Sequence, residues 1–244
     1  MNWRISGVKK IKLFCLPYAG ATSFIFSSLG SKVHNEIEVC PVELAGRGIR
    51  CDEPFCENFE EAVNDAYETI KDSLIDSPYA FFGHSMGSWL ALELYHKILE
   101  KGHNKPIHIF FSGNKPPHIP FSQKKIHTLP QLQFKQELLK LGGTKEEVFD
   151  NEELAKIFIP ILRADYKIIE NYKYVEKANK IDCGVTIFNG TLDVFTEDEI
   201  KLWQKYCEYE CRIINYEGGH FFINDKMEEI AECISDTIMS QMLL

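Results

Sequence analysis

One serine lies in a setting that suits nucleophilic attack on a carbonyl carbon. Ser85 is the third residue of the stretch GHSMG, which fits the pattern GxSxG. A short apolar run at residues 79–82 comes directly before it, and apolar residues recur at helical spacing from Met86 onward. Between a buried strand and a helix, GxSxG forms a sharp turn that holds a serine hydroxyl above the sheet edge, whereas elsewhere it is only a glycine-rich turn. We therefore predict Ser85 to be the nucleophile of a hydrolase.

A serine hydroxyl needs a nearby base, and one of the eight histidines is well placed to serve. His220 follows two glycines just beyond a predicted strand at 212–216, and these glycines allow a tight loop to deliver an imidazole to the sheet edge. We predict His220 to be the general base. The other histidines are interpreted as a satisfied core residue (His108), a residue near the cleft without a base's setting (His118), a neighbour pointing away from the nucleophile (His84), and solvated surface residues (His34, His96, His103 and His127).

The base in turn needs a carboxylate that orients it. Asp193 follows a predicted strand at 185–188 through a short turn that ends at the same edge of the sheet. The resulting order along the chain, nucleophile then acid then base, is typical of α/β-hydrolases and differs from the two serine protease orders. Asp198 and Glu197 are the alternatives, but they lie where a helix should start and favour its dipole. We predict Asp193 to be the acid.

Backbone N–H groups must stabilise the negative charge that develops on the attacked carbonyl oxygen. The loop at residues 16–21 follows the first predicted strand and reads LPYAGA, and its small residues leave N–H groups open. We predict that the N–H groups of Met86 and Ala19 form the oxyanion hole, with Tyr18 as the alternative to Ala19. A phosphate cradle is the competing interpretation, but neither GxGxxG nor a Walker lysine accompanies the loop. The predicted chemistry requires no metal and no cofactor.

These residues need a sheet that gathers several loops at one edge, and the chain alternates between strand-like and helix-like patterns. The predicted strands cover residues 11–16, 38–42, 79–82, 107–111, 185–188 and 212–216, and the helices between and after them begin near residues 58, 86 and 227. This alternation predicts the α/β class, with a mostly parallel central sheet and helices on both faces, as in the α/β-hydrolase fold.

Residues from about 115 to 180 break the alternation. They contain helical patterns at 134–141, from Thr144 with Glu147, and at 154–162, and no convincing strand, and we expect Pro160 to interrupt the third pattern. We therefore expect a single domain spanning residues 1–244, in which this segment is inserted as a helical lid subdomain.

The composition excludes several other classes of protein. The 244 residues include 27 basic and 36 acidic side chains, for a formal net charge of −9, without a concentrated run of Lys or Arg. This balance argues against binding to nucleic acid or to an anionic membrane. At 45% hydrophobic residues the chain is in the ordinary globular range, and no apolar stretch approaches the roughly 20 residues needed to span a bilayer.

Eight cysteines are scattered through the chain, which has no CxxC pair. Cys207 and Cys211 could share a helical face, but no histidine lies near them to complete a zinc site. We interpret most of the cysteines as small buried hydrophobic residues in a reducing compartment, and we expect a cytoplasmic protein without a metal.

Six stretches together resemble one known family. They read FCLPYAGA (14–21), YAFFGHSMGSWLALEL (79–94), SGNKPPH (112–118), FIPILRADYKIIENY (158–172), FNGTLD (188–193) and YEGGHFFI (216–223). In this order they are similar to the type II thioesterases of nonribosomal peptide and polyketide synthesis, and the resemblance covers nearly the whole chain. The departures are small: Ala21 stands where a second glycine is common, and Ser88 stands where glycine or alanine is usual.

The resemblance implies a free-standing hydrolase that clears mis-primed or stalled acyl groups from the 4′-phosphopantetheine arm of carrier domains, with a mobile lid over a shallow acyl site. We expect a monomer whose partners are acyl or peptidyl carrier domains. Such carriers are usually acidic, so cations on the lid side would have to offset the repulsion. The candidates are Lys115, Lys124, Lys125, Arg163 and Lys167.

Three other functions share much of this pattern. A general carboxylesterase or acyl-CoA thioesterase would have the same fold and the same three catalytic side chains. A product-releasing domain cut from a synthetase is disfavoured, because the chain begins just before its first predicted strand. A catalytically inactive hydrolase fold used as a binding partner is the third alternative, and the complete set of Ser, His and Asp argues against it.

Overall fold

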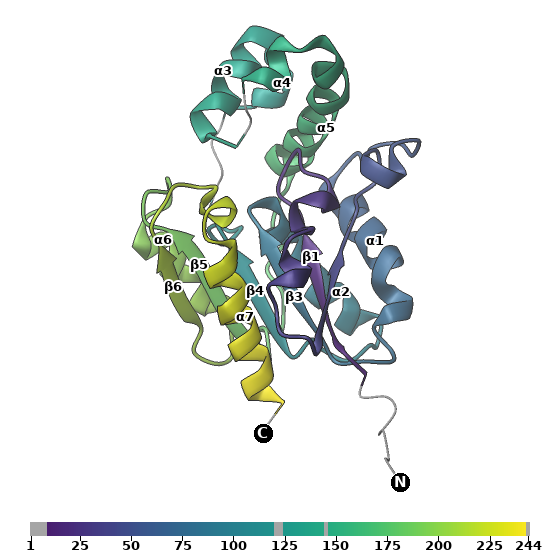
Figure 1. Ribbon diagram of the computed structural model, residues 1–244, viewed down its shortest axis with the longest axis vertical. Helices are drawn as coiled ribbons and strands as arrows, with labels where there is room; N and C mark the ends of the chain where they lie inside the picture. The colour runs from purple at the N-terminus through teal and green to yellow at the C-terminus, as the bar shows by residue number, and fades with distance from the viewer. Residues whose placement is uncertain (1–8, 120–123, 144–145, 243–244) are drawn as a thin grey trace.

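A six-stranded sheet forms the centre of the computed structural model, which describes residues 9–119, 124–143 and 146–242 (Figure 1). Its strands are β1 (Ile11–Leu16), β2 (Ile37–Pro41), β3 (Tyr79–His84), β4 (His108–Ser112), β5 (Gly184–Gly190) and β6 (Arg212–Tyr216). They lie in the order β2-β1-β3-β4-β5-β6, and each neighbouring pair is parallel. The predicted α/β fold is confirmed. Because the strands run the same way, the loops after them meet at one edge of the sheet.

Helices cover both faces of this sheet. The α-helices of the described residues are α1 (Phe59–Ile70), α2 (Met86–Glu100), α3 (Gln131–Leu141), α4 (Glu147–Asp150), α5 (Glu152–Asn171), α6 (Glu197–Lys201) and α7 (Met227–Gln241), of which α1, α2, α6 and α7 pack with the sheet. Alternate side chains of one strand point to opposite faces. In β3, Phe81 packs with the core that includes α1 and α2, whereas Phe82 packs with the core that includes α7. Every residue of β3 is buried, so the strand that leads to Ser85 is fixed from both sides.

Helices α3, α4 and α5 lie between β4 and β5 in sequence, and Figure 1 shows α3, α4 and the upper part of α5 standing above the rest of the molecule. We call these three helices the α3–α5 segment. A small core of its own includes Phe134 and Leu138 of α3 and Leu162 of α5. Whether the segment is a separate subdomain stays a prediction.

Pro160 lies inside α5 without ending it, so the expected interruption was wrong: the helix continues through 20 residues. A proline removes one backbone hydrogen bond, which costs roughly 3 kcal/mol in an isolated helix. The residues after it compensate by burial, because Ile161, Leu162, Ile168 and Ile169 all lie in the interior.

Candidate active site

Ser85 lies in the turn between β3 and α2 in a backbone conformation that side chains rarely adopt. Its φ of 54° and ψ of −114° make it the one non-glycine residue with positive φ in the described part of the chain. Two hydrogen bonds hold the turn: the Ser85 N–H donates to the carbonyl of Ser112 at 2.7 Å, and the Asn114 Nδ2 donates to the carbonyl of Ser85 at 2.9 Å. Strain of this kind is commonly stored where function requires it.

The two glycines of GHSMG are required by close backbone contacts. A Cβ atom at Gly83 would lie 2.1 Å from the carbonyl oxygen of Gly87, and one at Gly87 would lie 2.1 Å from the carbonyl oxygen of Leu16. Ser88 also tightens the turn. Its hydroxyl lies within hydrogen-bond distance of the carbonyl oxygens of Gly83 and Ser112, at 2.8 and 2.9 Å, and accepts the Ser112 N–H at 3.0 Å.

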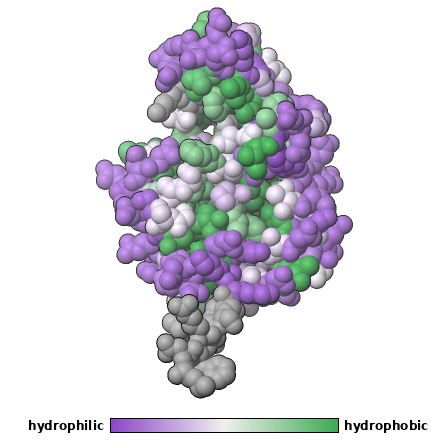
Figure 2. All heavy atoms as spheres, turned by 45° about the vertical axis from the view of Figure 1, so that its right-hand side comes forward, coloured by the Kyte–Doolittle hydropathy of each residue, from purple (hydrophilic) through white to green (hydrophobic). Residues whose placement is uncertain are grey.

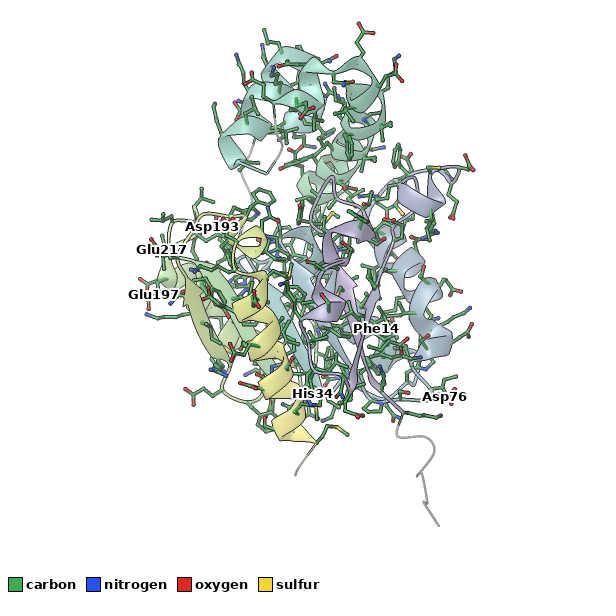
Figure 3. All side chains as sticks on the ribbon, in the orientation of Figure 1. Phe14, His34, Asp76, Asp193, Glu197 and Glu217 are labelled. Carbon is green, nitrogen blue, oxygen red and sulfur yellow. The ribbon has the colours of Figure 1, made fainter. Side chains whose placement is uncertain are left out.

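The loops after β5 and β6 are joined to one another. Thr191 N–H donates to the carbonyl of Tyr216, and Leu192 N–H donates to that of Gly218, each at 2.9 Å. These bonds bring the turn that carries Asp193 beside the turn that carries His220. Figure 3 shows Asp193 at the upper edge of the body, below the α3–α5 segment.

The structure brings Ser85, His220 and Asp193 into one chain of hydrogen bonds. The Nε2 atom of His220 lies 2.9 Å from the Oγ of Ser85, and its Nδ1 atom lies 2.9 Å from the Oδ2 of Asp193. The Asp193 side chain is fully buried and that of His220 is 15% exposed. The second oxygen of Asp193 accepts the Val194 N–H at 2.6 Å. This is the spacing that lets a serine pass its proton to an imidazole that a carboxylate orients.

His84 is buried beside this arrangement and cannot act as its base. Its Nδ1 lies 2.8 Å from the Oγ of Ser112, and its ring centroid lies 5.5 Å from that of His220. Burial, followed by the nearby charge of His220, lowers the pKa of His84 well below its ordinary value. A neutral His84 therefore packs against His220 without adding a second positive charge.

The backbone N–H groups predicted for the oxyanion hole flank Ser85. Ala19 lines the same cavity as Ser85, and within the described ranges no acceptor is found for its N–H. Met86 is the first residue of α2, so its N–H is one of the groups that a helix leaves unpaired. The next amide in the first loop is already engaged, because Gly20 N–H donates to the Oδ2 of Asp165 at 2.7 Å.

A cavity of about 420 Å³ opens above Ser85 and His220, between the sheet edge and the α3–α5 segment. Apolar and aromatic side chains form much of its wall: Leu141, Tyr166, Ile169, Leu192, Val194 and Phe195. A second groove of about 390 Å³ lies on the other side of Ala19, against α4 and α5. Figure 2 shows apolar side chains on both sides of a hollow between the α3–α5 segment and the body. The mainly apolar wall suits an acyl chain better than a highly charged ligand.

The remaining histidines lie outside this chain of hydrogen bonds. His108 is a satisfied core residue as predicted, since its two nitrogens lie 2.9 Å from Thr186 Oγ1 and Gln241 Nε2. His34 is exposed at the far end of the molecule (Figure 3). The prediction of a solvated His127 was wrong, because its ring is half-buried and pairs with Glu170. His118 bonds the Tyr206 hydroxyl and lines a different groove.

Two residues that the sequence analysis missed lie close to the first loop. Arg47 and Asp165 form a buried ion pair with two contacts of 2.6 Å. The sequence contains half of the signal for this pair. Asp165 falls at helical spacing among Ile161, Leu162, Ile168 and Ile169, and a carboxylate on a buried helix face requires a partner.

The described residues offer neither a metal cluster nor a membrane-spanning helix. Among those residues, no group of three or more His, Cys, Asp and Glu side chains could hold a metal ion. The helices that the structure describes are each too short or too polar to cross a membrane.

Comparison with known proteins decides the family. Residues 11–238 match the family model described as the thioesterase domain. The chain belongs to the thioesterase family. This thioesterase is 36% identical to the gramicidin S biosynthesis protein GrsT of Aneurinibacillus migulanus, over 95% of this chain and 90% of the relative. It is 32% identical to the thioesterase PikA5 of Streptomyces venezuelae, over 94% of this chain and 81% of the relative.

Solved structures agree with this family. The crystal structure of ClbQ from the colibactin NRPS/PKS pathway is 37% identical to this thioesterase and has a TM-score of 0.92, covering 96% of this chain and 99% of the other. The type II thioesterase BorB from the borrelidin biosynthetic cluster is 27% identical, with a TM-score of 0.84 and coverage of 97% and 96%. The identification of a type II thioesterase of α/β-hydrolase fold is confirmed, and the enzyme is a thioester hydrolase.

Proposed function

We propose that this thioesterase hydrolyses acyl or aminoacyl thioesters on the 4′-phosphopantetheine arm of carrier domains, with Ser85, His220 and Asp193 as its catalytic residues. The observation that carries the proposal is the pair of 2.9 Å contacts that join the three side chains at the floor of the cavity. The relatives GrsT, ClbQ and BorB carry names that place them in peptide or polyketide pathways, which supports carrier-bound thioesters as the substrate class.

The first half of the reaction transfers the acyl group to the enzyme. The Oγ of Ser85 attacks the thioester carbon while its proton moves to the Nε2 of His220. The carbonyl oxygen becomes negative and accepts hydrogen bonds from the N–H groups of Ala19 and Met86. The carbon–sulfur bond then breaks, and the sulfur leaves as a thiol with the proton from His220. A thiol leaves readily because its ordinary pKa is only about 8.5.

The second half frees the acid. Water attacks the acyl-Ser85 ester as His220 takes its proton, and the bond to the Oγ breaks with return of that proton to Ser85. Throughout, Asp193 holds the imidazole with Nδ1–H toward its carboxylate and stabilises the imidazolium that forms twice per cycle. The buried position of Asp193 keeps water from competing for this hydrogen bond.

The cations suggested for carrier docking are largely engaged within the protein. Lys115 pairs with Glu199 at 3.0 Å, Lys124 with Glu137 at 2.7 Å, and Lys167 with Glu57. In addition, Lys125 donates to Asn171 and Arg163 donates to the carbonyl of His127. The three lysines in ion pairs present little net positive charge to an acidic partner, whereas Lys125 and Arg163 bond neutral oxygens and keep their charge. We therefore expect carrier recognition to depend more on the exposed apolar side chains of Leu192 and Val194 at the cavity than on charge.

The test is mass spectrometry of defined acyl-carrier proteins, from acetyl to long-chain and aminoacyl groups, before and after treatment with the enzyme. We expect release of the acid from the carriers, and loss of at least about 10³-fold in kcat for Ser85→Ala because the nucleophile is removed. Matched oxyesters provide the comparison with a carboxylesterase. Equal turnover of carriers by the wild type and by Ser85→Ala would disprove the nucleophile, and faster turnover of oxyesters would favour the carboxylesterase.

We further propose that the enzyme works in the cytoplasm as a monomer, because its eight cysteines are free, as suits a reducing compartment, and the three proposed catalytic residues come from one chain. Size-exclusion chromatography with light scattering tests the second part of this proposal.

A further inference from the structure

A buried ion pair joins the α3–α5 segment to the body of the protein. Arg47 follows β2, and Asp165 lies on α5. The guanidinium of Arg47 contacts both oxygens of Asp165 at 2.6 Å, and the two side chains are only 3% and 1% exposed. Burial alone would lower the pKa of Arg47, but the charge and hydrogen bonds of Asp165 raise it above its ordinary value. Arg47 therefore remains charged.

The same pair holds the first loop on two sides. The Oδ2 of Asp165 accepts the N–H of Gly20 at 2.7 Å, and the Nη1 of Arg47 donates to the carbonyl of Ala21 at 3.3 Å. Gly20 and Ala21 directly follow Ala19, which lines the same cavity as Ser85 and whose N–H has no acceptor among the described residues. These bonds fix the peptide groups 19–20 and 21–22, and the planarity of each peptide restricts rotation in the loop that carries the Ala19 N–H.

Helix α5 also presses on this loop by packing. Gly20 has a φ of +84°, and a Cβ atom there would lie 2.3 Å from the Cδ2 of Leu162. Leu162 and Asp165 are nearly one helical turn apart, so α5 contacts the loop with an apolar and a charged side chain at once. A buried ion pair contributes little net stability compared with apolar residues of similar size. Its geometry therefore points to a role in placing the loop.

We propose that Arg47 and Asp165 are positioning residues that hold the Ala19 N–H in place for the oxyanion, so that α5 of the α3–α5 segment completes the active site. The proposal rests on the proposed function of Ala19 as an oxyanion donor. Neither side chain touches the substrate in this proposal; both act through the backbone of the first loop.

The test removes both charges together, because removing one would leave the other buried and unpaired. In Arg47→Met/Asp165→Leu we expect a folded enzyme whose kcat on a soluble acyl-pantetheine thioester falls 10- to 100-fold, with KM changed less than twofold. Complete loss of one oxyanion donor costs about 10²- to 10³-fold in kcat. We expect a smaller fall here because the donor is displaced and not removed. The pH dependence of kcat stays that of the wild type, because His220 and Asp193 are untouched.

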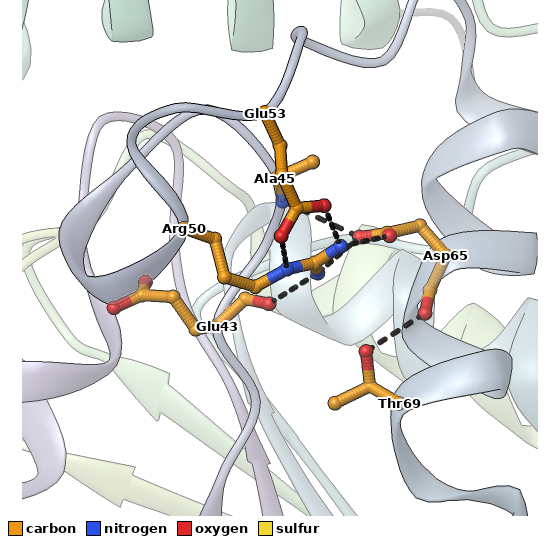
Figure 4. A network of polar contacts seen from close by, with 6 residues as sticks. All are labelled: Glu43, Ala45, Arg50, Glu53, Asp65 and Thr69. Carbon is orange, nitrogen blue, oxygen red and sulfur yellow. Dashed lines mark hydrogen bonds and ion pairs between the residues drawn. The ribbon is translucent and has the colours of Figure 1, made fainter.

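The control is a second Arg–Asp pair of the same chemistry. Arg50 contacts both oxygens of Asp65 at 2.6 and 2.8 Å and ties the loop after β2 to α1 (Figure 4). This pair contacts neither Gly20 nor α5. We expect Arg50→Met/Asp65→Leu to keep kcat within about twofold of the wild type. Equal losses in the two variants would overturn the proposal, because loop stability rather than the Gly20 contact would then be the cause. No loss in Arg47→Met/Asp165→Leu would also overturn it, because the pair would then have no effect on the oxyanion donor.

Phosphonylation of Ser85 by a fluorophosphonate separates this proposal from the proposed substrate. The tetrahedral adduct places an oxygen in the same oxyanion hole, so its rate of formation should fall at least 10-fold in Arg47→Met/Asp165→Leu and remain unchanged in the control. If the wild type is phosphonylated rapidly but hydrolyses no thioester, the proposed substrate class is wrong and the positioning role still stands. If Arg47→Met/Asp165→Leu is phosphonylated as fast as the wild type, the positioning role is wrong and the proposed substrate class is unaffected. Circular dichroism confirms that both variants are folded.

Discussion

Ser85 has a backbone conformation that costs roughly 1–3 kcal/mol in a residue with a side chain. Its surroundings offset this cost through bonds to Ser112 and Asn114 and through two glycines that allow backbone to lie against backbone. The site is therefore specified as much by the absence of side chains at residues 83 and 87 as by the presence of the serine hydroxyl.

Replacing Gly87 by alanine tests this point. Alanine is the better helix former by about 1 kcal/mol, so propensity alone favours the change. The new Cβ would lie 2.1 Å from the carbonyl of Leu16, however, and backbone on both sides cannot yield. We expect Gly87→Ala to lower the free energy of unfolding by about 1–3 kcal/mol in urea titrations. Gly30→Ala, with its nearest neighbour at 4.0 Å, is the control and should be close to neutral. Two indistinguishable titrations would contradict the steric explanation.

Helix α5 has two halves with different surroundings. The buried residues all follow Pro160, whereas Ile157 in the first half is 58% exposed. The first half begins at an N-cap, where the Asn151 side chain accepts the N–H groups of Glu153 and Leu154. Helix α1 has a similar cap at Asn58, but its apolar face is buried along its whole length. Loss of the N-cap should therefore destabilise only the first turns of α5, whereas in α1 it should destabilise the whole protein.

Alanine at each cap measures this difference. Removing an N-cap costs about 1 kcal/mol. We expect Asn58→Ala to lower the global free energy of unfolding by this amount, because α1 belongs to the main core. Asn151→Ala should instead speed hydrogen exchange in the first turns of α5 and leave global unfolding nearly unchanged. A global loss of equal size in both variants would show that α5 unfolds with the rest of the protein.

At the scale of the whole molecule, the core contains histidines that must stay neutral. Burial, as the main cause, lowers the pKa of His108 to about 4, and it lowers that of His84 well below its ordinary value. In the unfolded chain each would have a pKa near 6.5. Between the two values the unfolded chain binds more protons than the folded one, so stability falls as the pH falls from about 6.5 toward 4.

His108→Gln removes one of these groups. For a shift from about 6.5 to about 4, the wild type should lose about 2 kcal/mol more than the variant between pH 7 and pH 5. Urea titrations of both proteins at the two pH values give this difference directly. Because glutamine also removes hydrogen bonds to Thr186 and Gln241, only the change with pH is compared, not the absolute stability. The same slope in both proteins would refute the assignment to His108.

The features that the sequence predicted are those specified by residues within one short stretch of the chain. Apolar composition identified strands such as β3 and β4 because a strand buried on both faces has little freedom in composition. The edge strands β2 and β6 are only partly buried, and their apolar residues were still enough to predict them. The positions of Ser85, Asp193 and His220 were predictable because each follows a strand end. The pairing of Arg47 with Asp165 was not, since 118 residues separate them and no local pattern links their partners. His127 was misassigned for the same reason, because Glu170 lies far along the chain.

Pro160 gives α5 a pivot at the boundary between its halves. Lacking an N–H, it leaves the carbonyl of Lys156 without its helical donor, and helices bend most readily at such points. After Pro160, Asp165 bonds the N–H of Gly20, and Leu162 packs against Phe134 and Leu138 of α3. Helix α3 in turn contributes Leu141 to the cavity wall. A bend at residue 160 would therefore displace the N-terminal turns of α5 and leave both the cavity wall and the first loop in place.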